Sequence, residues 1–231
     1  MEKRDPRGDL RSYGRRRGRK PSPRQASLFD SLLPRVGLAL SDPPPAPIGA
    51  LFAPPAGDVW LEVGFGGGEH LVWQAAHNPG VGLIGCEPFQ DGVVKVLRAI
   101  EEQGLANIRL HADDARAVLR WLPDAAIGRA FVLFPDPWPK KRHQKRRLVS
   151  AATLRELARV MRPGAELRIA TDIDDYARWI LLAVRAEGSF AWQPASPADW
   201  RRRPADWPAT RYEQKAAREG RRCYYFRLSR R

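Results

Sequence analysis

Residues 58–69 read DVWLEVGFGGGE, an apolar run that ends in a glycine-rich turn. A short apolar run, a turn of this kind and then a helical period are typical of a strand and helix in a parallel sheet. Gly64, Gly66 and Gly68 can adopt the positive φ angles that allow a ligand to lie directly against the backbone. The stretch therefore predicts a first strand whose carboxyl end carries a ligand-binding turn.

The chain beyond residue 69 repeats this alternation of short apolar runs with helical periods. We expect strands at residues 59–63, 81–86, 108–112, 130–134, 166–170, 190–193 and 222–228. Helices are expected at residues 69–77, 90–103, 115–121, 148–161 and 173–187. The order predicts an α/β fold, namely a doubly wound, Rossmann-like and mostly parallel sheet with helices on both faces and an antiparallel strand near the C-terminus.

A length of 231 residues with an apolar fraction of 43% is sufficient for one hydrophobic core, so we expect one main domain at residues 58–231. Residues 1–24 are rich in arginine and glycine and are expected to form a basic, disordered arm that contacts RNA. Between these two parts, residues 25–57 combine a short helix near Ser27–Leu33 with a stiff, proline-rich connector.

Positive charge is concentrated in three segments of the chain. Lys and Arg outnumber acids by 7 in residues 1–24, by 6 in residues 138–147 and by 8 in residues 201–231. Because the whole chain carries +14, the remainder carries −7. A mildly acidic body with separate basic segments predicts a polyanionic partner, such as a nucleic acid, that is contacted at specific places.

The composition argues against several other classes of protein. Cys86 and Cys223 lack the spacing of a disulfide framework or a thiolate metal site, and the four histidines lack metal-ligand spacing, so no metal is expected. No apolar run approaches the roughly 20 residues of a membrane span, and the basic N-terminus lacks the apolar core of a signal peptide. We therefore expect a cytoplasmic protein with no membrane partner, and the sequence leaves open whether it is a monomer or a homodimer.

Acidic residues surround the glycine-rich turn. Glu69 stands where a dinucleotide fingerprint has its third glycine, and its negative charge would oppose a pyrophosphate. Glu87 follows the second expected strand, where a carboxylate can accept hydrogen bonds from both ribose hydroxyls. The turn is therefore better suited to a nucleoside than to a dinucleotide.

Residues 134–147, FPDPWPKKRHQKRR, follow the fourth expected strand. Three prolines end the strand and stiffen the turn that holds the carboxylate of Asp136. Six cations follow without an intervening acid, a density that favours an anion nearby. This combination predicts an active-site loop that meets nucleic acid, and a solvated loop followed by a basic helical turn is the alternative.

The acid followed by alternating glycines resembles the first motif of the S-adenosylmethionine-dependent methyltransferases. This resemblance implies that Glu62, Gly64 and Gly66 hold the methionine part of S-adenosylmethionine, that Glu87 binds its ribose, and that an acid after the third strand lies near its adenine. Asp113 and Asp114 both occupy that last position. We favour Asp114, because it directly precedes the expected helix and can cap it.

Several motifs together resemble the tRNA (guanine-N7-)-methyltransferase family of the bacterial type. They are RSYGRRRGR at residues 11–19, EVGFG at 62–66, FPDPWPKKRH at 134–143, TD at 171–172 and TRYEQK at 210–215. The resemblance implies transfer of a methyl group from S-adenosylmethionine to N7 of a guanosine in the variable loop of tRNA, at position 46 of the tRNA. An N7 lone pair is free at neutral pH, so the reaction needs positioning rather than a strong general base.

The same resemblance implies roles for residues around the reacting base. Asp136 is the candidate catalytic residue and also faces the cofactor. The residues implied to contact the substrate are Lys140, Asp172, Thr210, Arg211, Tyr212 and Glu213. Those implied to track the RNA backbone are Arg142, Lys145, Arg146 and Arg147.

Two other functions are alternatives at this stage. Asp136-Pro137-Trp138 is similar to the acid-Pro-Pro-aromatic motif of enzymes that methylate exocyclic amines, although here Trp138 lies between two prolines. The second alternative is an RNA-binding protein with a degenerate, cofactor-free Rossmann domain. The acids around the glycine-rich turn argue against it, because they would have no physical role in such a protein.

Overall fold

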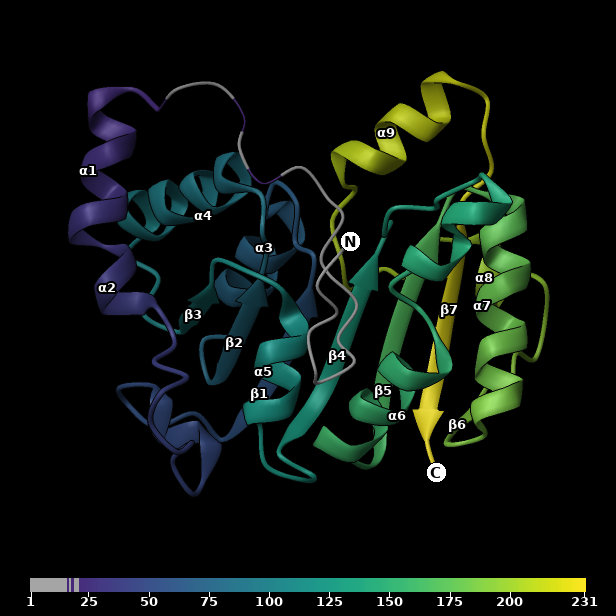
Figure 1. Ribbon diagram of the computed structural model, residues 1–231, viewed down its shortest axis with the longest axis horizontal. Coiled ribbons are helices and arrows are strands. Elements are labelled where there is room, and N and C mark those ends of the chain that lie inside the picture. Colours follow the sequence, from purple (N-terminus) through teal and green to yellow (C-terminus); the bar gives the residue numbers. More distant parts are fainter. Residues whose placement is uncertain (1–15, 17, 19–20) are drawn as a thin grey trace, which may run out of the picture.

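The computed structural model describes Arg16, Gly18 and residues 21–231, so most of the predicted basic arm lies outside the described residues. Within these residues one sheet has the strand order β3-β2-β1-β4-β5-β7-β6 (Figure 1). The strands are β1 (Asp58–Val63), β2 (Val81–Cys86), β3 (Ile108–His111), β4 (Ile127–Leu133), β5 (Met161–Thr171), β6 (Phe190–Ala191) and β7 (Tyr224–Arg230).

The first five strands are parallel, and β7 is antiparallel to its neighbours β5 and β6. This arrangement confirms the predicted mostly parallel sheet with an antiparallel strand near the C-terminus. The chain runs outward from β1 to β3 and then crosses back, so that Glu62 of β1 is paired with Gly85 of β2 on one side and with Phe131 of β4 on the other. A reversal of strand order of this kind opens a ligand-binding crevice at the carboxyl ends of the strands.

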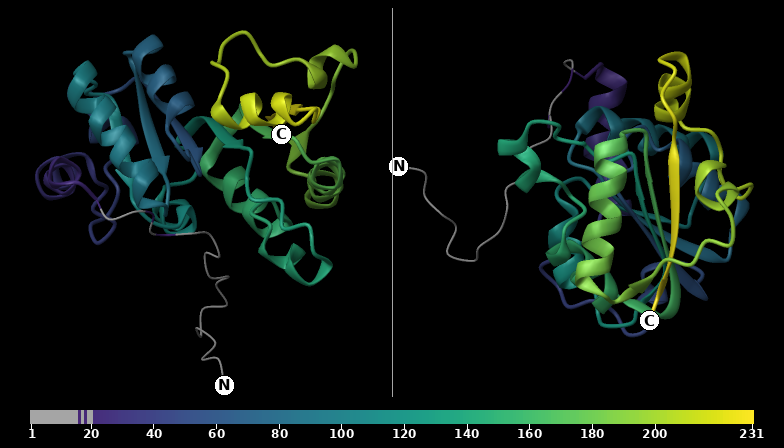
Figure 2. Two further views of the ribbon diagram at one scale, coloured as in Figure 1. Left: turned by 90° about the horizontal axis from the view of Figure 1, so that it is seen from above. Right: turned by 90° about the vertical axis from the view of Figure 1, so that its right-hand side faces the viewer.

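Helices cover both faces of the sheet, as predicted (Figure 2). They are α1 (Pro23–Ser31), α2 (Leu33–Val36), η1 (Ile48–Leu51), α3 (Glu69–His77), α4 (Gln90–Gln103), α5 (Ala115–Trp121), η2 (Lys141–Arg146), α6 (Ala151–Val160), α7 (Asp174–Glu187), α8 (Ala198–Arg201) and α9 (Arg211–Arg218). One buried cluster contains residues of the four helices α1, α2, α3 and α4 together with Trp60 and Phe131 of the sheet. The other cluster contains residues of α5, α6 and α7 together with Leu61 and Val132 of the sheet. The alternation of adjacent residues between the clusters follows from the period of two in a strand.

Residues 25–57 do more than connect the arm to the sheet. Ile48 and Phe52 are buried in the same cluster as α5 and α6, and the amide of Leu38 donates to the carbonyl of Leu110 in β3 at 2.9 Å. The prediction of a connector is therefore incomplete, because this segment packs against the core. The short helix predicted at Ser27–Leu33 is divided between α1 and α2.

Two of the differences between the predicted and the observed helices involve capping hydrogen bonds. The helix predicted from Leu148 begins instead at Ala151, because the hydroxyl of Ser150 accepts a hydrogen bond from the amide of Thr153 and caps α6. The helix α9 was not predicted, although Thr210 and Glu213 have the spacing of a capping box. None of the helices in the described ranges is long and apolar enough to cross a membrane.

Candidate active site

The glycine-rich turn between β1 and α3 has the predicted backbone conformation. Gly64, Gly66 and Gly68 have φ angles of 75°, 55° and 80°. A Cβ on Gly66 would lie 3.0 Å from the hydroxyl of Tyr212, and a Cβ on Gly67 would overlap the guanidinium of Arg211. The missing side chains therefore allow the beginning of α9 to lie close above the turn.

Glu62 and His70 form a buried pair beneath this turn. Oε2 of Glu62 lies 2.7 Å from Nδ1 of His70, and each residue is 2% exposed. The buried position of Glu62 is consistent with a carboxylate held in a fixed orientation. Sequence reasoning assigned no role to His70, because one histidine on the apolar face of a helix gives no distinctive pattern.

Glu87 lies at the end of β2 and is 8% exposed. Its two carboxylate oxygens accept hydrogen bonds from the backbone amides of Gly66 at 2.7 Å and Phe89 at 2.9 Å. Burial raises the pKa of Glu87, with smaller contributions from the charges of Asp136 and Glu62, and the two amide hydrogen bonds oppose the rise. The carboxylate is thus tied to the glycine-rich turn and lies within electrostatic reach of Asp136.

The two acids after β3 have different partners. Asp114 caps α5 by accepting a hydrogen bond from the amide of Arg116 at 2.9 Å, which confirms its predicted capping role. Burial alone would raise the pKa of Asp114, but hydrogen bonds and charge from Arg116 outweigh it and lower the pKa. Asp113 pairs instead with Arg16 at 2.6 Å. Which of the two faces an adenine stays a prediction.

The Asp136 turn is the exposed part of the site. Phe134 and Trp138 have φ angles of 51° and 42°, a left-handed conformation that is strained for bulky residues and is found at functional sites. Asp136 is exposed, and among the described residues none donates a hydrogen bond to its carboxylate. Partial desolvation by the surrounding turn nevertheless raises the pKa of Asp136. The turn therefore presents a carboxylate whose hydrogen-bonding capacity is open to a ligand.

Residues at the start of α9 lie on the wall opposite the glycine-rich turn. Tyr212 is 40% exposed and stacks on Phe134, with ring centroids 6.1 Å apart. Asp172 is paired with Arg221 at 2.7 Å, and Arg211 is paired with Glu69 at 2.8 Å. Each of these predicted substrate residues thus already has a protein neighbour.

Thr210 and Glu213 have structural roles that were not predicted, although their spacing is that of a capping box. The hydroxyl of Thr210 accepts from the amide of Glu213 at 3.3 Å, and Glu213 accepts from the amide of Thr210 at 2.8 Å. The hydroxyl of Tyr225 donates to the other carboxylate oxygen of Glu213 at 2.7 Å. Both residues are buried, and Thr210 also lines the pocket, so Glu213 stabilises the start of α9 while Thr210 can reach a ligand.

The structure contradicts the prediction that Arg147 tracks the RNA backbone. Its side chain has no exposed surface, its Nε donates to the carbonyl of Pro137 at 2.8 Å, and it is paired with Asp175. The guanidinium lies 4.9 Å from the ring centroids of both Tyr176 and Trp179. A planar guanidinium stacks on aromatic rings in this way, and Arg147 therefore fixes the Asp136 turn to α7.

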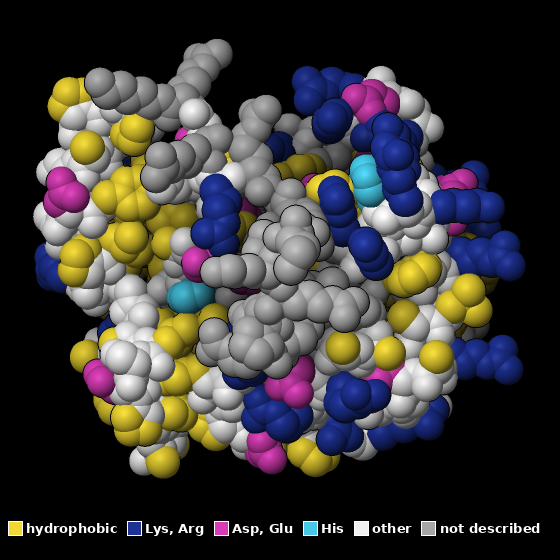
Figure 3. All heavy atoms as spheres, in the orientation of Figure 1, with side chains coloured by type: hydrophobic (Ala, Val, Ile, Leu, Met, Phe, Trp, Pro, Cys, Tyr) yellow, Lys and Arg dark blue, Asp and Glu magenta, His cyan; other side chains and the backbone are white. Residues whose placement is uncertain are grey.

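The other cations of the loop are arranged differently. Lys140, Lys141, Arg142 and Lys145 are exposed on and before η2, whereas the guanidinium of Arg146 lies 5.1 Å from the ring centroid of Trp138. Trp138 thus packs within the loop. On the face drawn in Figure 3, Lys and Arg gather over the C-terminal half of the molecule, and the opposite half shows mainly apolar and uncharged groups.

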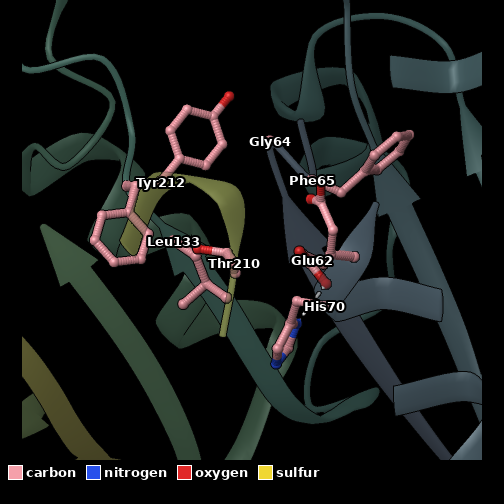
Figure 4. Close-up of a pocket in the computed structure, with 9 residues that line it drawn as sticks. Glu62, Gly64, Phe65, His70, Leu133, Thr210 and Tyr212 are labelled. Carbon is pink, nitrogen blue, oxygen red and sulfur yellow. Dashed lines mark hydrogen bonds and ion pairs between the residues drawn. The ribbon is translucent and has the colours of Figure 1, made fainter. Parts of the chain in front are cut away.

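A pocket lies between the two halves of the sheet (Figure 4). Glu62, Gly64 and His70 lie on one wall, and Thr210 and Tyr212 lie on the other. A bare-backbone turn flanked by carboxylates fits a ligand that carries an amino group, hydroxyls and a positive charge, and it would repel a pyrophosphate. This set of hydrogen-bond acceptors fits S-adenosylmethionine. Among the described residues, no group of three or more His, Cys, Asp and Glu is placed to hold a metal ion.

Comparisons with known proteins agree with this chemistry. A family model described as "Putative methyltransferase" matches residues 56–226. A tRNA (guanine-N(7)-)-methyltransferase of Mesorhizobium japonicum is 50% identical over 92% of this chain and 91% of its own length. The protein of that name from Rhodospirillum rubrum is 49% identical over 98% and 90%.

Solved structures show the same fold at low sequence identity. The 16S rRNA methyltransferase KamB has a TM-score of 0.51 and 18% identity, and the similarity covers 75% of this chain and 89% of KamB. The [4+2]-cyclase SpnF has a TM-score of 0.52 and 17% identity, and the similarity covers 76% of this chain and 75% of SpnF. These likenesses concern the fold alone, since one fold can support different reactions.

The fold and the acid-lined glycine turn define a methyltransferase that uses S-adenosylmethionine as its methyl donor. Identity near 50% over more than nine-tenths of the chain then identifies the family. The chain belongs to the tRNA (guanine-N7-)-methyltransferase family.

Proposed function

We propose that this chain transfers the methyl group of S-adenosylmethionine to N7 of a guanosine in tRNA, and that the guanosine lies in the variable loop. Family membership supports the reaction and the tRNA substrate. The observation that carries the proposal within the structure is Asp136, an exposed carboxylate without a hydrogen-bond donor among the described residues, at the crevice end of β4.

The chemistry of N7 suits a site of this composition. The lone pair of N7 forms the new bond to the methyl carbon, and the electrons of the broken C–S bond stay with sulfur. The sulfonium becomes a neutral thioether, and the purine acquires the positive charge. A carboxylate beside the purine stabilises the growing charge and can accept hydrogen bonds from N1 and N2 of guanine. We assign this role to Asp136.

The roles of the cofactor residues follow from their surroundings. Glu87 is suited to accept from the ribose hydroxyls, because each of its oxygens has lone pairs beyond those used by Gly66 and Phe89. Glu62 is suited to the methionine part, next to the bare backbone of Gly64 and Gly66. The exposed Lys140, Arg142 and Lys145 would contact phosphates, which supports RNA rather than a small acceptor.

The test is methylation of unmodified tRNA by the purified protein with methyl-labelled S-adenosylmethionine. Nucleoside mass spectrometry should show 7-methylguanosine, and sequencing of the modified RNA should locate it in the variable loop. Methylation of an exocyclic nitrogen would overturn the assignment of the reaction. Formation of 7-methylguanosine at another site would overturn only the variable-loop position.

A further inference from the structure

A row of buried polar side chains leads from the cofactor turn to the segment before α9. Glu62, His70 and Gln74 are 2%, 2% and 1% exposed. The ring of His70 packs edge-on against Phe131 and Trp207, with ring centroids 4.5 and 5.6 Å apart. Buried polar groups cost free energy unless their hydrogen bonds are made, so the direction of each bond in this row is informative.

Backbone carbonyls, which only accept hydrogen bonds, fix the amide orientations in the row. Nε2 of Gln74 lies 2.9 Å from the carbonyl oxygen of Asp206 and must therefore be the amide NH2. Nδ2 of Asn78 lies 2.9 Å from the carbonyl oxygen of Gln74 and donates its second hydrogen to Oε1 of Gln74 at 3.1 Å. The second hydrogen of the Gln74 amide is then available to Nε2 of His70, which is 3.1 Å away.

This orientation determines where the proton of His70 is located. Because Gln74 donates to Nε2, that nitrogen carries a lone pair, and the proton of the neutral ring is on Nδ1. Nδ1 lies 2.7 Å from Oε2 of Glu62 and donates to it. A hydrogen on Nε2 would point at the amide hydrogen of Gln74, so the geometry disfavours the Nε2-protonated tautomer.

We propose that His70 is a positioning residue for cofactor binding: its neutral, Nδ1-protonated ring holds the carboxylate of Glu62, and Gln74 fixes that tautomer. The inference rests on the role proposed above for Glu62. The same residues also connect the cofactor turn to the segment before Thr210, because the other amide hydrogen of Gln74 is donated to the carbonyl of Asp206. Asp206 lies four residues before Thr210, and its carboxylate accepts two hydrogen bonds from the buried Arg168, at 2.9 and 2.7 Å.

The first experiment measures the tautomer directly in the full chain without ligand. Nitrogen-15 NMR of histidine-labelled protein should show a proton on Nδ1 and none on Nε2 of His70, with the signals assigned by their loss in His70→Asn. Gln74→Glu replaces the donor to Nε2 with an acceptor of equal size, so both ring nitrogens should then carry protons. A proton on Nε2 alone in the native chain, or a spectrum unchanged by Gln74→Glu, would overturn the proposal.

The second experiment measures S-adenosylmethionine binding by calorimetry. His70→Asn keeps an amide donor near the place of Nδ1, whereas His70→Leu has similar size and no donor. We expect His70→Leu to weaken binding about tenfold and His70→Asn to recover most of this loss, in line with one hydrogen bond to a charged group. Equal binding by the two variants, with both folded, would reduce His70 to a packing residue.

Glu62→Gln separates failure of this inference from failure of the proposed cofactor role. If Glu62→Gln binds S-adenosylmethionine as the native chain does, the role of Glu62 is wrong, whatever tautomer His70 adopts. If Glu62→Gln binds weakly while His70→Leu binds normally, the cofactor role stands and the positioning role of His70 fails.

Discussion

The two sides of the crevice hold their carboxylates in opposite ways. On the cofactor side Glu62 and Glu87 are 2% and 8% exposed, and each is hydrogen-bonded within the protein. On the substrate side Asp136 is exposed, and no described residue donates to it. Hydrogen bonds within the chain orient Glu62 and Glu87, whereas the carboxylate of Asp136 has none from the described residues. Under the roles proposed above, the cofactor carboxylates are held in place before binding, and the guanine carboxylate acquires its hydrogen-bond partners from the RNA.

The carboxylates of the two sides nevertheless interact electrostatically. The charge of Asp136 contributes to the raised pKa of Glu87, after the larger effect of burial. A cationic sulfonium between these acids would relieve their repulsion, and a cationic purine would do the same after methyl transfer. Variants that change one side and leave the other intact should therefore separate cofactor binding from catalysis.

The largest effect is expected for Asp136→Asn. The rate of methyl transfer at saturating substrates should fall about 100-fold or more, because a neutral amide cannot stabilise the cationic purine. Single-turnover assays with tRNA measure this rate, and the exposed Asp30→Asn on α1 is the matched control. A rate within about threefold of the native value would place the reacting centre elsewhere.

Thermal unfolding distinguishes this loss from misfolding. Desolvation raises the pKa of Asp136 in the folded chain, so its charged form costs stability at pH values above that pKa, and the cost disappears on acidification. Neutralisation by Asn removes the cost at neutral pH. The variant should therefore unfold at the same temperature as the native chain or at a higher one.

Glu87→Gln should weaken S-adenosylmethionine binding by about tenfold or more, since hydrogen bonds to charged groups contribute roughly 1.5–3 kcal/mol. Calorimetry without tRNA measures this change. The control is Glu102→Gln at the far end of α4, which should bind normally. Normal binding by Glu87→Gln would contradict the ribose role of this carboxylate.

The pH dependence of binding provides a check on the same residue. The pKa of Glu87 is raised, so acidification protonates this group earlier than an ordinary glutamate. Cofactor affinity should therefore fall as the pH decreases through that pKa and level off above it, and Glu87→Gln should show a flatter profile. An equally steep acid limb in the variant would assign the titration to another group.

On the substrate side, replacement of Lys140, Lys141 and Arg142 by Gln should weaken tRNA binding without changing cofactor binding. Each lost phosphate contact should reduce the slope of log affinity against log salt by about one. Filter binding over a range of salt concentrations measures the slope. Arg98→Gln on α4, in the cofactor half, is the control and should leave the slope unchanged.

The smallest effect is expected for Arg147→Met, which keeps much of the apolar stem but removes the hydrogen bond to Pro137. The Asp136 turn should loosen, so the transfer rate should fall several-fold, while the salt slope of tRNA binding should not change because Arg147 is buried. A reduced salt slope would restore the original assignment of Arg147 to the RNA surface.

The fold was predictable from sequence wherever one local pattern determined the outcome. Short apolar runs around Leu61, Leu83 and Phe131 each became a buried strand, and the glycines after Val63 took the expected positive φ angles. The antiparallel β7 was expected despite its irregular aromatic run. The packing of residues 25–57 against the core was not predicted, because it depends on contacts such as Leu38 with Leu110, which are distant in sequence.

The site was less predictable, since charge in a sequence does not reveal burial. Arg146 and Arg147 are adjacent in one basic run, yet one lies over Trp138 and the other is enclosed between Tyr176, Trp179 and Asp175. Helix α7, which encloses Arg147, follows nearly thirty residues later. The capping box at Thr210, in contrast, could have been recognised from its spacing to Glu213.

Calorimetry of S-adenosylmethionine binding to Asp136→Asn tests the separation of the two sides most directly. The predicted dissociation constant is within about fivefold of the native value, because an exposed charge contributes less than ~1 kcal/mol. A loss of binding as large as that of Glu87→Gln would contradict this separation and would favour the cofactor-facing role that the family resemblance also implies for Asp136.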